Sequence, residues 1–159
     1  MTMETSVPRT GPEPASCRTV EKRRSHLRSA LTATEVALLR QPGPDPSAWL
    51  AEVRRSLESL RVAFDQHVDV HEGADSFHAD VLRHQPALAS RVTWLQRDHR
   101  RLELQLSELS ERVNAPVTSE SVVRVRTRGL DLVHRFARHR KKGADLVWDA
   151  FSYDVGGEQ

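Results

Sequence analysis

Four histidines lie on stripes of hydrophobic residues that recur at every third or fourth position: His67, His71, His99 and His139. Such stripes mark the buried face of a helix. Burying an imidazole costs about 2 kcal/mol or more unless both ring nitrogens find partners. A single buried histidine is more often a core residue with satisfied hydrogen bonds than a ligand. Four at one depth would instead predict a metal site, because imidazole binds Zn, Fe, Cu and Ni.

Two carboxylates stand beside these histidines in the sequence. Glu72 follows His71 and Asp98 precedes His99, so each is rotated by about 100° from the stripe of its own segment. Glu72 is therefore a candidate ligand, and Asp98 a candidate partner that orients a ligating ring. His26 is a further candidate ligand, although it lies on the flank of its segment.

Four segments with helical periodicity must position these side chains. Proline-containing breaks at residues 41–46, 84–86 and 114–116 separate them, since proline removes a backbone donor and ends helices. The segments cover about residues 20–40, 47–82, 87–113 and 119–152. Their apolar positions alternate steps of three and four, the spacing at which helices pack in bundles. The prediction is an all-α, up-down-up-down four-helix bundle, with Ser47 and Ser119 as N-caps.

The spacing also predicts the depth of each histidine. His67 comes 20 residues after Ser47 and His139 comes 20 after Ser119, so the two rings should lie level. His99 falls within about 3 Å of the same level across the second hairpin. Gly73 interrupts the second segment, and the sequence leaves open whether that helix continues past it.

The predicted helical domain covers residues 19–155. Residues 1–18 carry three prolines among small polar residues and are predicted to form a flexible tail, as are residues 156–159. The arginine-rich composition, with 21 arginines among 24 basic residues, is typical of a G+C-rich bacterial source.

Taken together, these motifs resemble the hemerythrin-like cation-binding domain family. The resemblance rests on His67 with an acid about a turn later, on His99 after an acidic residue, and on His139 at the end of Leu-Val-His-Arg-Phe-Ala-Arg-His. It runs over residues 20–156 and includes the closing segment 150–157. It implies a four-helix bundle that binds iron through histidines and bridging carboxylates and serves in O₂ or iron handling or sensing.

The sequence departs from the family pattern at both bridging carboxylates. Where the family has glutamate four residues after the histidines of its second and fourth helices, this sequence has His71 and Gly143. The departure disfavours a di-iron centre, because two ferric ions would lack charge compensation. It leaves one transition metal, iron or zinc, or a metal-free bundle. The basic residues 138–142 beside His139 also oppose a cation.

Composition excludes several other classes of function. The single cysteine rules out an internal disulfide and fits a reducing, cytoplasmic location, and no apolar run approaches the ~20 residues of a membrane span. No phosphate loop or nucleophile motif is present, so we expect no enzymatic activity. Basic runs without interleaved aromatics disfavour nucleic-acid binding. The competing interpretation is a metal-free, degenerate hemerythrin-like bundle that binds a protein partner.

Overall fold

A computed structural model describes residues 15–151, and this part of the chain is helical throughout its regular structure. The helices are α1 (Ala15–Leu39), α2 (Pro46–His71), α3 (Phe77–His84), the 3₁₀ turn η1 (Pro86–Leu88), α4 (Ala89–Val113) and α5 (Ser119–Phe151). No strand occurs among the described residues, so the all-α prediction is confirmed. No helix among them is long and apolar enough to cross a membrane.

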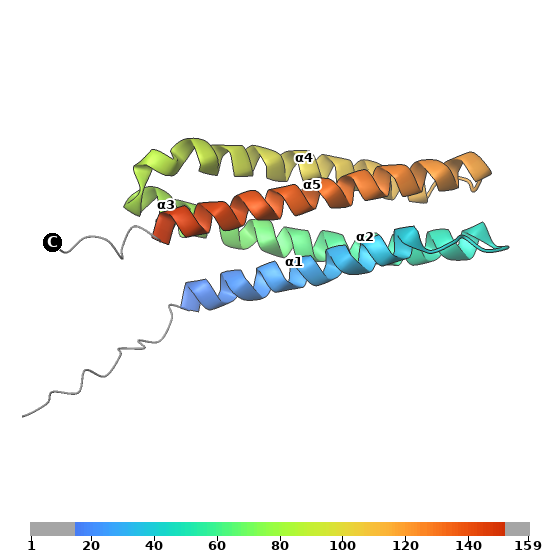
Figure 1. Ribbon diagram of the computed structural model, residues 1–159, viewed down its shortest axis with the longest axis horizontal. Coiled ribbons are helices and arrows are strands. Elements are labelled where there is room, and N and C mark those ends of the chain that lie inside the picture. The colour runs from blue at the N-terminus through green and yellow to red at the C-terminus, as the bar shows by residue number, and fades with distance from the viewer. Residues whose placement is uncertain (1–14, 152–159) are drawn as a thin grey trace, which may run out of the picture.

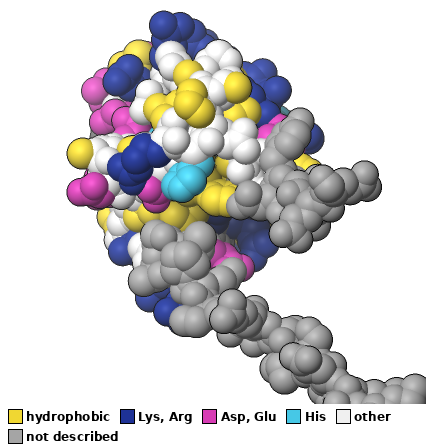
Figure 2. Space-filling model, turned by 90° about the vertical axis from the view of Figure 1, so that its left-hand side faces the viewer, with side chains coloured by type: hydrophobic (Ala, Val, Ile, Leu, Met, Phe, Trp, Pro, Cys, Tyr) yellow, Lys and Arg dark blue, Asp and Glu magenta, His cyan; other side chains and the backbone are white. Residues whose placement is uncertain are grey.

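The four long helices lie side by side and are joined at alternate ends of the molecule (Figure 1). α1 packs against α2 and α5, and α4 packs against α5 and α2, while the short α3 and η1 lie at one end. Viewed onto that end, basic and acidic side chains are interspersed with hydrophobic ones (Figure 2).

The termini of the helices differ from the sequence prediction in detail. α1 begins at Ala15 rather than near residue 20, so residues 15–18 of the predicted tail are helical. The rest of that tail and the predicted tail 156–159 lie outside the described residues, as does most of the closing segment 150–157.

The two predicted N-caps, Ser47 and Ser119, are wrong by one or two residues. Asp45 caps α2 and its carboxylate accepts from the backbone N–H of Ser47 at 2.9 Å, because Pro46 takes the first helical position. At α5 the hydroxyl of Thr118 accepts from the backbone N–H of Ser121, whose own hydroxyl accepts from the N–H of Thr118.

The second segment is broken at Gly73. α2 ends at His71, and Gly73 has a φ of 121°, a conformation that residues with a Cβ rarely adopt. Ser76 then caps α3 by accepting from the backbone N–H of Ala79. α3 is thus a separate helix after the break, and its residues His78 and Val81 are buried.

Two hydrophobic clusters make up the core, and the predicted histidines separate them. The larger cluster includes Phe64 of α2, Leu102 of α4 and Phe136 of α5, while the smaller one joins Val81, Val92, Leu95 and Leu146. On α4 and α5 the histidine falls between a residue of each cluster, and on α2 it follows Phe64. The rings of Phe64 and Phe136 meet edge to face with their centroids 5.0 Å apart, and they lie next to the histidines on the side of the larger cluster.

Two glycines of α5 provide a matched test of this packing. Exchanging glycine for alanine inside a helix ordinarily gains about 1 kcal/mol. A Cβ at Gly129 would lie 2.6 Å from Cδ2 of the fully buried Leu38, whereas one at Gly143 would meet only Arg24 Nη2 at 3.8 Å. We expect Gly129→Ala to lower the free energy of unfolding by about 1–2 kcal/mol and Gly143→Ala to raise it by up to about 1 kcal/mol. Urea unfolding measures both, and equal effects would contradict the close contact between α1 and α5.

Candidate metal centre

Three histidines from three different helices meet inside the molecule. His67 of α2, His99 of α4 and His139 of α5 each offer a ligand nitrogen, and these atoms all lie within 4.8 Å of one another. The ring centroids are separated by 5.3 Å for His67 and His99 and by 4.6 Å for His99 and His139. All three side chains are buried. The depth that the spacing predicts for these rings therefore agrees with the structure.

Carboxylates on neighbouring helices hold two of the rings. Asp98 Oδ2 lies 2.9 Å from Nδ1 of His139, and Glu72 Oε1 lies 2.6 Å from Nδ1 of His99. Because an ionised carboxylate can only accept, each Nδ1 carries the proton and donates it. For the ring of His99, which burial keeps neutral, the lone pair is therefore on Nε2. Ligating histidines in metal proteins are oriented by the same type of contact.

His71 shows the same arrangement with a backbone acceptor. Its Nδ1 donates to the carbonyl oxygen of His67 at 2.7 Å, which leaves the lone pair on Nε2. The ring stacks on His67 with centroids 4.0 Å apart, although His71 is not part of the close group of three. His71 therefore lies next to the three-histidine group as a fourth nitrogen donor.

The polar atoms that lack partners are concentrated at this one place. Among the described residues, the buried side-chain atoms without a hydrogen bond are His67 Nδ1, His71 Nε2, His78 Nδ1 and His99 Nε2. Each unsatisfied buried group costs about 1–3 kcal/mol. A bound cation coordinated by these lone pairs would remove part of that cost.

Burial keeps these imidazoles neutral, as a metal ligand must be. It lowers the pKa of His71 to about 3 and that of His78 to about 4, with smaller contributions from neighbouring histidines and from Arg24. Burial likewise holds the pKa of His67 and of His99 far below the ordinary value, assisted by the positive charge that the adjacent rings would carry.

Two of the predicted ligands are not placed to bind. His26 is exposed on the outside of α1, where Nδ1 lies 3.1 Å from Gln66 Oε1, because the buried stripe of α1 runs through Leu27. Glu72 is the C-cap of α2 and its carboxylate is taken by Nδ1 of His99, so it orients a ring instead of serving as a ligand. Asp98 has the orienting position predicted for it, although the ring it holds is His139 rather than its neighbour.

A cavity of about 310 Å³ opens beside the histidines, and two of the residues that line it were not among the predicted site residues. His78 was not among the candidate ligands but is buried, with its ring stacked on His99 at a centroid distance of 6.0 Å. Arg24 of α1 also lines the cavity. Arg24 continues the hydrophobic stripe of its own segment, midway between Val20 and Leu27, so the sequence contained a signal for it. His78 lies one step before Val81, but the break at Gly73 separates it from the stripe of α2.

Searches of protein-family models, of curated proteins and of solved structures find no match to this chain.

Proposed function

We propose that this protein is a hemerythrin-like, up-down-up-down four-helix bundle that binds one transition-metal ion on His67, His99 and His139. His71 is placed to be a fourth donor. The observation that carries the proposal is that, in two of the histidines, one ring nitrogen is held by an oxygen acceptor while the other ring nitrogen has no partner. His71 and His99 each have Nδ1 bound to an oxygen acceptor and Nε2 buried without a partner.

The donor set fits a single divalent ion. In a tetrahedral zinc site with bonds of 2.0–2.1 Å the ligand atoms lie about 3.3 Å apart. The three histidine nitrogens lie within 4.8 Å of one another, so small ring rotations must bring them closer together when an ion binds. Imidazole donors accept Fe(II) as well as Zn(II). Asp98 and Glu72 place negative charge behind two of the rings, which offsets the charge of one ion.

Two iron ions are disfavoured by the charges around the cavity. Its described lining contains no carboxylate that could bridge two metals, and it contains Arg24, Arg140 and Lys141. Gly143 stands one turn after His139, and the guanidinium of Arg24 donates to its carbonyl oxygen at 3.2 Å. The space that a bridging glutamate would need is thus next to a positive charge.

Metal binding or sensing in the cytoplasm, rather than catalysis, is the role we assign. The described lining of the cavity has no carboxylate, hydroxyl or thiol nucleophile, and its histidines, which could otherwise act as bases, are, apart from His78, the ligands of the proposed ion. A bound ion would supply a Lewis-acidic centre, and the residues of this chain would hold it and limit its access to water.

Metal titration of protein produced without a histidine tag tests the proposal. Chelator-treated protein is titrated with Zn(II) by calorimetry and, without oxygen, with Fe(II), and bound metal is measured by elemental analysis. We expect one ion per chain. Two irons per chain with a near-ultraviolet oxo-bridge absorption band would contradict the single-ion site. No binding of either metal would overturn the proposal and leave a metal-free bundle that binds a protein partner.

A further inference from the structure

The cavity beside the histidines is positively charged and has no counter-charge in its described lining. Arg24, Arg140 and Lys141 contribute cations, and the remaining lining residues are histidines, glycine, alanines and hydrophobic side chains. Lys141 lies 3.3 Å from Asp145 and is exposed, so its charge is partly compensated outside the cavity. The arginines remain as the source of the positive field inside.

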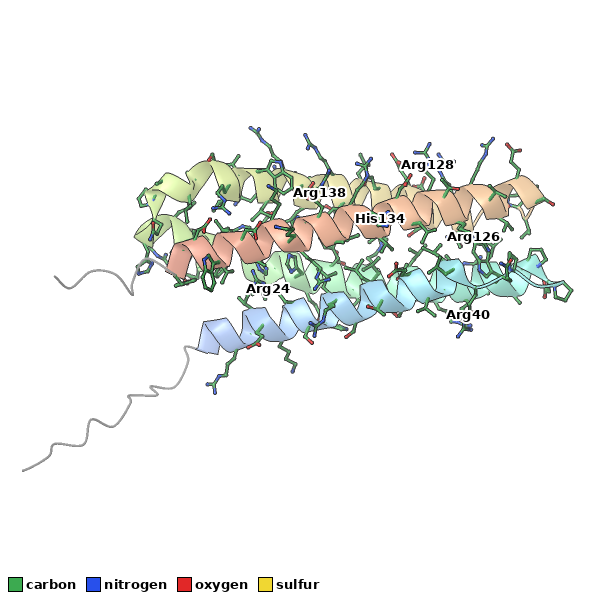
Figure 3. All side chains as sticks on the ribbon, in the orientation of Figure 1. Arg24, Arg40, Arg126, Arg128, His134 and Arg138 are labelled. Atoms are coloured by element: carbon green, nitrogen blue, oxygen red, sulfur yellow. The ribbon has the colours of Figure 1, made fainter. Side chains whose placement is uncertain are left out.

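Arg24 is the cation held most firmly in this cavity. It projects from α1 into the space between α1 and α5 (Figure 3) and is half-buried. Nη2 donates to the carbonyl oxygen of Gly143, and the guanidinium lies 5.9 Å from the centre of the Phe77 ring. No ion pair joins Arg24 to a carboxylate among the residues that the structure describes.

This environment is costly for an arginine without an anion. Burial and the charge of Arg140 lower the pKa of Arg24, so both disfavour the charged form that arginine nevertheless keeps. A Cβ at Gly143 would lie 3.8 Å from Arg24 Nη2, so the glycine leaves the space beside the guanidinium open. Arg24 and Gly143 both line the cavity, and the guanidinium is accessible from it.

We propose that the cavity binds a small organic carboxylate, which pairs with the guanidinium of Arg24 and lays a short apolar group against the partly exposed ring of Phe77. A guanidinium presents parallel N–H groups that match the two oxygens of a carboxylate. The volume of about 310 Å³ is at the lower end of the range for small-molecule sites, which favours a ligand of a few carbon atoms. The apolar lining suits the hydrocarbon part of such a ligand better than a bare phosphate.

This inference does not depend on the proposed metal, and its test uses metal-free protein. Calorimetry compares butyrate and benzoate with their neutral amides, butyramide and benzamide. We expect the carboxylates to bind at least tenfold more tightly than the amides. Arg24→Gln should lose at least tenfold in affinity for the carboxylates. Arg24→Lys should lose less, because lysine keeps the positive charge but lacks the parallel N–H groups of the guanidinium.

Arg28→Gln is the matched control, since Arg28 lies one turn along α1, is exposed and does not line the cavity. It should bind butyrate like the unaltered protein, and thermal melts of all variants establish that they are folded. Equal binding of acid and amide, or unchanged binding by Arg24→Gln, would overturn the proposal. Binding of inorganic phosphate but of neither carboxylate, with loss in Arg24→Gln, would also overturn it in favour of a phosphate site. A failed metal titration leaves this result unaffected.

Discussion

Replacing His99 with alanine should abolish stoichiometric metal binding, so that bound Zn(II) falls from about one ion per chain to close to zero. His99 contributes a buried Nε2 that has no partner in the protein, and its ring is the one closest to His139. His67→Ala should have the same effect, because it removes a second of the three ligands. Elemental analysis after dialysis against zinc measures the loss.

Two further variants show whether the loss is specific. His84→Ala changes an exposed histidine of α3 and should leave one ion per chain bound. Asp98→Asn keeps every proposed ligand but alters the acceptor at Nδ1 of His139, and should weaken affinity by about 10–100-fold without abolishing binding. Full zinc occupancy in His99→Ala, or equal losses in His84→Ala, would contradict the three-histidine site.

The metal-free protein should lose stability steeply as the pH falls below about 6.5. His67, His71, His78 and His99 all have a pKa in the folded state below the unfolded value, because burial disfavours their charged form. Below pH 6.5 the unfolded chain therefore binds more protons than the folded one, and stability falls with falling pH. Each histidine contributes about 1.4 kcal/mol per pH unit, so four approach about 5 kcal/mol per unit.

Since small domains are stable by about 5–15 kcal/mol, we expect acid unfolding at about pH 5. Urea unfolding at intervals of pH measures the slope. His78→Leu should make the slope of stability against pH shallower by one proton, because it removes one of the four buried rings. A melting temperature that stays flat from about pH 7.5 to 5.5 would contradict the neutrality of these rings.

Helical periodicity predicted where most of the candidate site lies. The alternation of three and four placed His67, His99 and His139 on buried faces, and equal distances from the helix starts placed His67 level with His139. These placements depend only on the rise and turn of a helix, which hold along any uninterrupted segment. They do not extend past a break in the helix. Gly73 ends α2 after His71 and reorients the next helix, so the position of His78 could not be extrapolated from α2.

The contacts between helices could not be predicted from the sequence, for a different reason. The sequence showed that Asp98 and Glu72 lie next to the histidine stripes, but it did not show which ring each carboxylate would hold. Asp98 holds His139 on α5, 41 positions away, and Glu72 holds His99, 27 positions away. Such pairs depend on the rotation of each helix about its axis, which is set by packing in the whole core rather than by local pattern.

By itself the sequence determined that this protein is helical, where its four long helices lie along the chain, and that histidines interrupt their apolar faces. Each of these follows from interactions between residues three or four positions apart. Only the tertiary structure decided which nitrogens have acceptors, which remain unpaired, and that Arg24 lies beside them in a cavity without a carboxylate. These features arise between helices, at distances where a change of about one ångström separates a hydrogen bond from none.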